Sequence, residues 1–388
     1  MRPPDCPGLP GAFGRRRIAP ILLIALAAAI GAAAAPPQKI FPLRYDQHDF
    51  ENGLRLITVP AEYPNVVALQ VVVHAGSRNE VEPGKSGFAH FFEHMMFRGT
   101  KLFPPEKWEA TMKRAGAATN AYTSDDLTVY HATFSKEDLD EILAMEADRF
   151  QNLEYAEPAF RTEALAVLGE YNKNSASPTS KLMEVLRDTA FDQHTYKHTT
   201  MGFLADIKEM PNQFDYSRQF FRRFYRPEYV TGLVGGDVNP EKVRATVGKH
   251  FGAWKRGDYR AQIAAEPPQA APRSNHVDWP SRTLPWLAMG FRTPGYSDSD
   301  KVYAALDLIG SIGFSENSDL YKKLVIREQK VDALFGGVSA HEDPYLFTIL
   351  TRIKNPADMN PVRDEILATA NSFQHTLVLQ ERLDAVKK

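Results

Sequence analysis

The sequence predicts a folded two-domain protein of the α+β class with mixed sheets, and three observations support this organisation. Segments rich in β-branched residues alternate with amphipathic helical stretches along the chain. The length of 388 residues suits two domains, at roughly 100–200 residues per domain. A composition of 43% hydrophobic and 24% charged residues is that of a folded globular protein. The net charge of -2 gives no indication of nucleic-acid binding.

The first half of the chain carries clear turn, strand and helix signals. Asn52-Gly53 predicts the turn of a hairpin within residues 43–60. The run VVALQVVVHA, residues 66–75, predicts a buried strand, and Ser86 predicts the N-cap of a helix that extends to Met96. The sequence Ser-Lys-Glu-Asp at residues 135–138 predicts an acidic variant of a capping box, in which Ser135 caps a long helix. Further expected elements are helices over 105–116, over 157–173 and from 240, and strands over 119–123, 128–134 and 230–235.

A change of composition divides the chain. Residues 256–280 are rich in Ala and Pro, which predicts an interdomain linker. The predicted domains are therefore residues 43–255 and 281–388. In the second domain we expect strands over 286–291, 333–339 and 346–353 and a helix over 299–309, and the halves show no clear sequence repeat.

The N-terminus has the features of a targeting segment. Arg15–Arg17 precede the apolar run 18–30 and an alanine-rich end, which predicts a cleaved signal peptide over residues 1–34. The alternative is an uncleaved anchor, but the run is short for a full membrane span. The protein is then exported, periplasmic in a Gram-negative source and otherwise secreted, with no stable membrane span after cleavage. Cys6 is removed too, which excludes a cysteine nucleophile and thiolate zinc ligands.

Residues 90–94, His-Phe-Phe-Glu-His, form the chemically informative motif. His90 and His94 are four residues apart, so both imidazoles lie on one helical face and can bind one metal ion. Glu93 shares that face and can act as general base toward a metal-bound water. The alternative is a solvated polar face. Polar groups in a helix surrounded by apolar residues need a partner, which favours a metal. The apolar residues around the motif are Phe88, Phe91, Phe92, Met95, Met96 and Phe97.

Two histidines leave a catalytic zinc one protein ligand short. The stretch GSRNEVEPGKSGFAHFFEHMMFRGT resembles the pitrilysin, insulinase and mitochondrial processing peptidase family. The resemblance implies a third ligand 76 residues after His94, and residue 170 is Glu. It implies another glutamate seven residues earlier, which is Glu163. Seven residues are two helical turns, so Glu163 shares a face with Glu170 and can orient a ligand or hold a proton. Without the motif, both would be read as exposed helix glutamates.

The resemblance extends from about Leu43 to about Ala370 and includes the segments LVGGDVNPEKV, WLAMGFRTP and DLYKKLVIREQ. Residues 116–123 are similar to the family's edge strand, which faces the zinc and pairs with substrate through main-chain hydrogen bonds. Asn120 and Ala121 are the residues that we expect to contact substrate; the alternative is an ordinary strand. The resemblance further implies two similar domains of mixed sheet packed with helices, forming half of a clamshell.

Two departures from the family pattern concern the second domain. Arg327 aligns with an arginine of the family's substrate site, but residue 334 is Leu where the family's complete enzymes have Tyr. The sequence also stops at Lys388 inside an amphipathic stretch, which predicts an incomplete second domain. We therefore expect a related second subunit, in a hetero- or homodimer, to supply the missing hydroxyl.

The sequence as a whole predicts a zinc metalloendopeptidase that hydrolyses peptides or unfolded polypeptide segments with one Zn²⁺ per chain. Zinc is favoured over manganese or cobalt by ligand type. One alternative is a non-catalytic subunit that only shapes a peptidase chamber, but such subunits have usually lost ligands. A second is an exported zinc-binding module, which would not need Glu93 beside the ligands.

Overall fold

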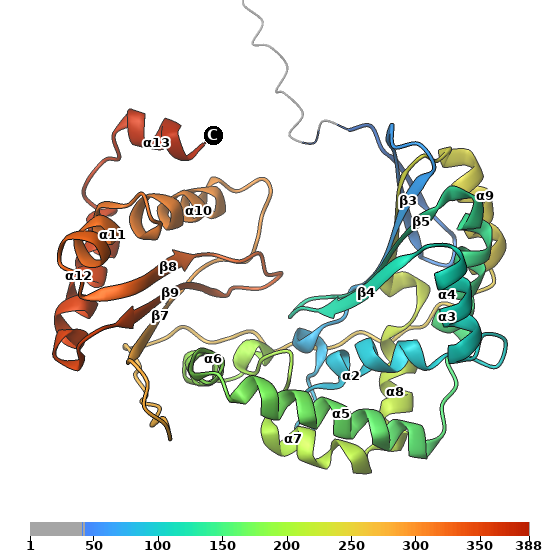
Figure 1. Ribbon diagram of the computed structural model, residues 1–388, viewed down its shortest axis with the longest axis horizontal. Coiled ribbons are helices and arrows are strands. Elements are labelled where there is room, and N and C mark those ends of the chain that lie inside the picture. Colours follow the sequence, from blue (N-terminus) through green and yellow to red (C-terminus); the bar gives the residue numbers. More distant parts are fainter. Residues whose placement is uncertain (1–40, 42, 388) are drawn as a thin grey trace, which may run out of the picture. The chain divides into compact units, whose positions relative to one another are not determined.

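The computed structural model describes residue 41 and residues 43–387, and the predicted signal peptide, residues 1–34, lies outside them. The residues from Arg44 onward form one compact unit with two separate sheets and many helices, which confirms the mixed fold class (Figure 1). No helix among the described residues is long and apolar enough to cross a membrane.

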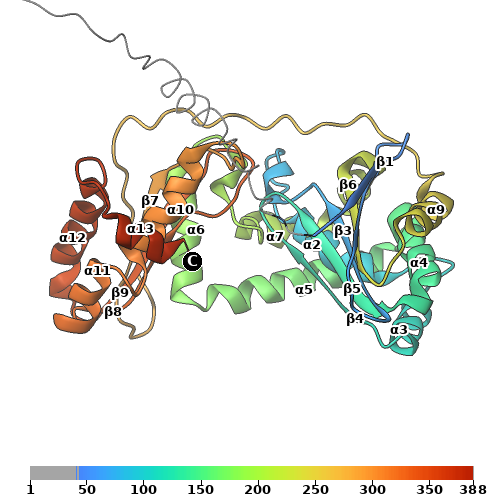
Figure 2. The same ribbon diagram turned by 90° about the horizontal axis from the view of Figure 1, so that it is seen from above.

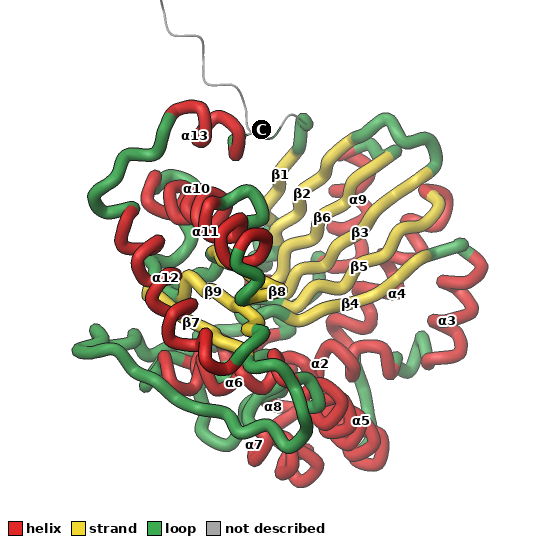
Figure 3. Tube along the Cα trace, turned by 60° about the vertical axis from the view of Figure 1, so that its left-hand side comes forward, coloured by secondary structure: helices red, strands yellow, loops and turns green. Residues whose placement is uncertain are grey.

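The first sheet has six strands in the order β1-β2-β6-β3-β5-β4. The pair β2 and β6 is parallel and the other pairs are antiparallel, and β4 lies at the edge (Figure 3). The Asn52-Gly53 turn joins β1 to β2, as predicted. The strands are β1 (Asp46–Asp49), β2 (Arg55–Pro60), β3 (Val66–Val73), β4 (Ala118–Thr123), β5 (Thr128–Ser135) and β6 (Val230–Gly236).

Helices pack on this sheet because buried apolar residues alternate with more exposed residues along its strands. Val67, Leu69, Val71 and Val73 of β3 are buried, whereas the residues between them are more exposed. Helices α4 and α9 contribute residues to the same core and lie against the sheet (Figure 2). The helices of this region are α2 (Phe88–Met95), α3 (Pro105–Arg114), α4 (Leu139–Asn152), α5 (Glu157–Ser175), α6 (Pro178–Ala190), α7 (Leu204–Glu209), α8 (Phe214–Phe224) and α9 (Pro240–Phe251).

The second sheet is antiparallel, in the order β7-β9-β8, and has its own apolar core. Leu334 and Ile349 are among the buried residues of that core. The elements are β7 (Trp286–Arg292), α10 (Lys301–Phe314), α11 (Asp319–Tyr321), β8 (Val331–Gly337), β9 (Leu346–Ile353), α12 (Met359–Ser372) and α13 (Gln380–Val386).

No helix or strand is present between α9 and β7, the segment that contains the predicted linker. Glu266 anchors this segment, because its carboxylate accepts hydrogen bonds from the backbone N–H groups of residues 192–194 at 2.8–2.9 Å. Arg292 of β7 also donates to Glu266, at 3.0 Å. The segment is therefore tied both to the end of α6 and to the second sheet.

Two predicted helix caps are wrong. Ser86 does not cap α2; its hydroxyl donates to Asp206 at 2.6 Å and accepts from Phe203 N–H at 2.8 Å. Ser135 does not cap the following helix either, because its hydroxyl donates to Asn65. In both places the tertiary contact outcompetes the local one that the sequence pattern favours.

Candidate metal centre

The position of α2 is set at its N-terminus. Gly87 is the N-cap, with φ of 93°, a conformation that L side chains rarely adopt. Glu80, fully buried, accepts hydrogen bonds from Gly87 N at 2.8 Å and Ala89 N at 2.7 Å. Its two carboxyl oxygens satisfy two of the backbone donors that a helix leaves open at its N-terminus, while burial raises the pKa of Glu80 to about 8. Glu80 thus performs the capping that the sequence assigned to Ser86.

Aromatic packing fixes the rotation of α2. Phe88, Phe91 and Phe92 are fully buried, and Phe92 stacks on Phe220 at 5.4 Å between centroids. With those faces committed to the core, the remaining face of the helix carries His90 and His94. Their rings lie 4.8 Å apart in an edge-to-face arrangement.

Helix α5 brings Glu170 against this pair. Glu170 Oε2 lies 3.5 Å from His90 Nε2 and 3.4 Å from His94 Nε2. These separations are long for hydrogen bonds. They match the spacing of ligands around one tetrahedral zinc, since donor atoms about 2.0–2.1 Å from the ion are about 3.3 Å apart. The donor atoms of all three residues lie within 4.8 Å of one another, so the residues present fit a zinc ion.

Burial gives His90 the protonation state that a metal needs. Desolvation, reinforced by the nearby His94, lowers the pKa of His90. The imidazole is therefore neutral at pH 7, the form that binds a metal. Among the described residues, His90 Nδ1 is a buried ring nitrogen without a hydrogen-bond partner.

Glu93 lies beside the three residues but is held by a different element. Thr123, the last residue of β4, donates a hydrogen bond from Oγ1 to Glu93 Oε2 at 2.7 Å. Burial raises the pKa of Glu93 above its usual value, and the bond from Thr123 opposes that rise. A half-buried carboxylate with a raised pKa is suited to accept a proton near neutral pH.

Glu163 is buried behind His94. Its Oε2 lies 3.6 Å from His94 Nδ1, and its Oε1 accepts a hydrogen bond from Arg98. Because Nδ1 is the ring nitrogen that does not face Glu170, Glu163 is placed to orient the ring from behind. The structure therefore brings together all five residues that the sequence singled out around the motif: His90, Glu93, His94, Glu163 and Glu170.

The other predicted site residues are placed differently from one another. Asn120 is exposed on β4, whereas the neighbouring residue Ala121 is buried, with 8% of its surface exposed. Arg327 is exposed at the end of a π-helical segment, η7 (Lys322–Arg327), and lies outside the candidate metal cluster. Leu334 is 2% exposed in the core of the second sheet, with exposed Phe335 after it.

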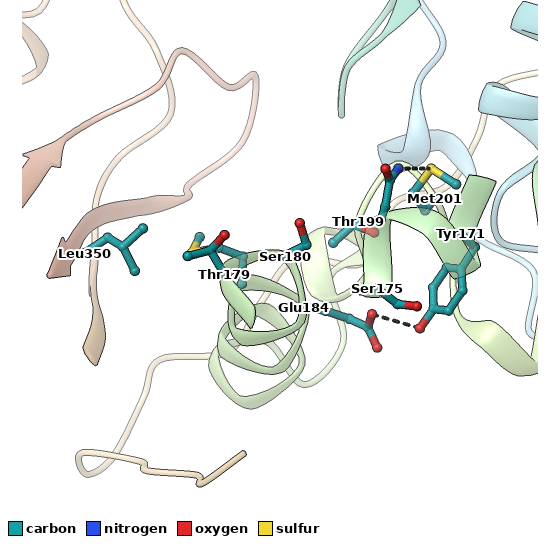
Figure 4. Close-up of a pocket in the computed structure, with 10 residues that line it drawn as sticks. Tyr171, Ser175, Thr179, Ser180, Glu184, Thr199, Met201 and Leu350 are labelled. Atoms are coloured by element: carbon teal, nitrogen blue, oxygen red, sulfur yellow. Dashed lines mark hydrogen bonds between the residues drawn. The ribbon is translucent and has the colours of Figure 1, made fainter. Parts of the chain in front are cut away.

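A cavity of about 420 Å³ lies along the face of α5 that carries Glu170. Asn174 lines it one helical turn beyond Glu170, and Met183 and Glu184 of α6 form another wall. Glu184 accepts a hydrogen bond from Tyr171 at 2.9 Å (Figure 4). Lys181 also donates to Glu184, at 2.6 Å, so the charge of Glu184 is already compensated. Leu350 of β9 completes the lining.

The described residues thus form a mixed α/β fold whose candidate metal centre combines two histidines and a glutamate with a neighbouring carboxylate, an arrangement typical of metal-dependent hydrolases. Comparison with known families agrees. Residues 55–203 match the family described as Insulinase (Peptidase family M16), and residues 213–388 match the description Peptidase M16 inactive domain. The chain belongs to peptidase family M16.

Individual relatives support a peptidase function. The zinc protease PqqE of Helicobacter pylori is 30% identical over 373 residues, which span 95% of this chain and 82% of that protein. The beta subunit of the mitochondrial-processing peptidase of Bos taurus is 29% identical, over 67% of this chain and 53% of that one.

Solved structures agree with the fold. A Helicobacter pylori protease superimposes with a TM-score of 0.83 at 29% identity, covering 89% of this chain and 84% of that one. An M16-like peptidase of Alicyclobacillus acidocaldarius, at 16% identity, has a TM-score of 0.75 and covers 89% of this chain and 82% of that chain.

Sequence reasoning missed two residues that shape this centre. Glu80 lies in a polar loop, and nothing local distinguishes it from a solvated glutamate. Thr123 was read as part of a strand, without a role toward Glu93. The predicted strand did contain a signal for this role. The expected substrate strand faces the zinc, which places the hydroxyl of its last residue, Thr123, on the side of the proposed base Glu93.

Proposed function

We propose that the protein is a zinc metalloendopeptidase whose ion is held by His90, His94 and Glu170. The observation that carries the proposal is the pair of 3.4–3.5 Å separations between Glu170 Oε2 and the two histidine Nε2 atoms. Zinc bound there would lower the pKa of a coordinated water to about 7 and polarise a peptide carbonyl. The names of the zinc protease relatives support this choice of metal.

The remaining roles follow from the contacts of each residue. Glu93 accepts a proton during attack and returns it to the leaving amine, as general base and then general acid. Thr123 holds the carboxylate of Glu93 in one orientation. Glu163 keeps the His94 ring in place, and Arg98 compensates the buried charge of Glu163.

The substrate is a peptide or an unfolded polypeptide segment that adds to the edge of β4. β4 pairs with β5 on one side, and its other side is the edge of the sheet. Main-chain bonds there select an extended backbone and impose little sequence preference. Asn120 offers its side chain to the peptide, Ala121 its main chain, and the cavity past Asn174 offers room for a substrate side chain.

A related second subunit completes the substrate site. The Leu334 side chain is committed to the core of the second sheet and carries no hydroxyl, so it cannot act as a donor toward substrate. Arg327 would contact the peptide only when the second subunit completes the part of the substrate site that lacks the hydroxyl. A relative that is named as the beta subunit of a processing peptidase favours this two-subunit arrangement.

The proposed organisation is a signal peptide over residues 1–34, a catalytic domain over 43–255, a linker over 256–280 and a second domain over 281–388. PqqL of Escherichia coli, a periplasmic protease that is 31% identical over 56% of this chain, favours export to the periplasm in a Gram-negative source. N-terminal sequencing of the natural protein should give a start near Ala35; an intact Arg15–Arg17 segment would refute export with cleavage.

Cleavage of an unstructured peptide by wild type and Glu93→Gln tests the function. We expect the zinc-loaded wild type to cleave, with its partner present if one is required, and Glu93→Gln to retain zinc without cleaving. Equal cleavage by both would show that Glu93 is not the base. Zinc binding without cleavage by either would favour a binding module, and neither property would favour a chamber-forming subunit.

A further inference from the structure

The loop between β8 and β9 extends from the second sheet and carries a buried histidine. His341 is 8% exposed, and its ring stacks on Tyr345 with 3.6 Å between centroids and an interplanar angle of 18°. His341 Nδ1 lies 2.9 Å from the Ser339 carbonyl oxygen. The ring is therefore fixed in orientation by its own loop, with Nε2 pointing away from it.

This loop docks on the turn that joins β4 to β5, residues 124–127. His341 Nε2 lies 2.9 Å from Asp125 Oδ2. The neighbouring Glu342 donates its backbone N–H to Asp126 Oδ2 at 3.1 Å. Both acidic side chains of the turn are thus bound by consecutive residues of the second sheet's loop.

The opposite side of the turn is held within the first domain. Asp125 Oδ1 accepts hydrogen bonds from Ser77 at 2.8 Å and Arg187 at 2.7 Å. Gly76 allows close approach, because a Cβ there would lie 2.4 Å from the carbonyl oxygen of Asp125. Removing the His341 contact leaves Asp125 Oδ2 buried without that partner, and such a group costs about 1–3 kcal/mol unless the turn moves to satisfy it.

The turn is directly connected to the proposed base. Thr123 is the residue before the turn, and its hydroxyl binds Glu93 Oε2 at 2.7 Å. The backbone N–H of Ser124 donates to Leu127 O at 2.8 Å, which closes the turn as a unit. A displacement of Asp125 therefore moves Thr123 and the orientation that it gives to Glu93.

We propose that His341 is a positioning residue for the peptidase reaction, acting through Asp125 and Thr123 on Glu93. The inference rests on the proposed function, in which Glu93 is the general base. The second sheet lies in the region that matches the family described as Peptidase M16 inactive domain. Through His341, this sheet would contribute to catalysis by positioning Glu93. The contact between His341 and Asp125 fixes the turn, and Glu93 carries out the proton transfer.

The test compares His341→Leu with a matched control, Arg292→Gln. Arg292 ties the second sheet to Ala190 and Glu266, without touching the turn. Its variant therefore measures general loosening between the sheets. His341→Gln is the conservative variant, because its amide keeps one donor toward Asp125. If His341→Leu does not fold, His341→Asn, whose side chain is too short to bridge Ser339 and Asp125, replaces it.

We expect His341→Leu to lower kcat about tenfold, within the up to about 10²-fold loss that misplacement of a catalytic group can cause. KM and zinc content should change less than twofold, and His341→Gln should recover most of the rate. In a Thr123→Val background the His341 change should add nothing, because its path is already broken. An unchanged kcat, equal losses in Arg292→Gln, or additive effects with Thr123→Val would each overturn the proposal.

Hydrogen exchange supplies a readout that does not depend on activity. Backbone amides of residues 118–127 should exchange faster in His341→Leu, with or without zinc, and at the wild-type rate in Arg292→Gln. Unchanged exchange there overturns the proposal even if the zinc peptidase function is established. Faster exchange in a wild-type-folded protein that never cleaves peptide would instead place the failure in the proposed function.

Discussion

Thr123 Oγ1 donates a 2.7 Å hydrogen bond to Glu93 Oε2, joining the edge strand β4 to the helix that carries the histidine motif. The strand expected to bind the peptide backbone therefore also orients the group expected to accept the proton. Substrate and base then share one rigid support, which favours a reactive geometry without further ordering.

The first prediction concerns this bond. Thr123→Val keeps the shape of the side chain and removes the donor, so kcat should fall about tenfold while zinc content stays at the wild-type level. Thr119→Val is the matched control, because Thr119 of the same strand donates instead to the His131 carbonyl oxygen. Steady-state kinetics measure kcat for both variants. An equal loss of kcat in the two variants would show that Thr123 only stabilises the strand and does not orient Glu93.

The second prediction concerns Glu163. Glu163→Gln removes the charge 3.6 Å from His94 Nδ1, and loss of such an outer partner typically weakens metal affinity about 10–100-fold. Glu157→Gln, an exposed change on the same helix, should leave affinity unaltered. Competition with a chelator measures both. Wild-type affinity in Glu163→Gln would mean that Glu163 supports the fold and not the metal.

The third prediction is a dependence of stability on pH at Asp125. Burial alone would raise the pKa of Asp125, but Arg187 and His341 outweigh it and hold the pKa well below the usual range. A lowered folded-state pKa adds stability that is complete above the ordinary aspartate pKa of about 3.9 and is lost below it. Asp125→Asn should thus be less stable by about 3–5 kcal/mol at pH 7, the usual cost of breaking a buried pair.

Chemical unfolding at several pH values measures this difference. The gap between wild type and Asp125→Asn should be constant above about pH 5 and shrink as the pH falls below about 4. A gap that does not change down to pH 3 would contradict the ionic role of Asp125.

The fourth prediction concerns Leu334. Leu334→Tyr forces a larger, polar side chain into a filled core and should destabilise the protein by about 1–3 kcal/mol without increasing cleavage. Phe335→Tyr, at a position that is 61% exposed, should be neutral in stability. Thermal unfolding and a cleavage assay compare the pair. A gain of activity in Leu334→Tyr would show that the residue faces the substrate.

The motif and the helix that carries it could be predicted from the sequence because both are local. The i and i+4 spacing of His90 and His94 sets a common face, and the apolar residues around them indicate a helix packed in a core. Glu170 was reached by the resemblance alone, and its distances to the histidines show that α5 delivers it to the same point.

The contacts that tune the centre are long-range, which is why the sequence did not reveal them. Asp125 and His341 are 216 positions apart, and nothing in the local pattern of either residue indicates the other. Glu80 replaces the predicted Ser86 cap because the chain folds it over the helix end, a tertiary arrangement without a local signal. Strand alternation buries Ala121, so its contact with substrate stays a prediction that involves its main chain.

Anomalous diffraction at the zinc edge, from crystals of the zinc-loaded protein, shows whether His90, His94 and Glu170 hold the ion. We expect one strong peak per chain, about 2.0–2.2 Å from Nε2 of His90, Nε2 of His94 and a carboxylate oxygen of Glu170. The peak should persist in Glu93→Gln, because Glu93 is not a ligand. A peak that involves other residues, or none at this site at full zinc loading, would contradict the proposed metal centre.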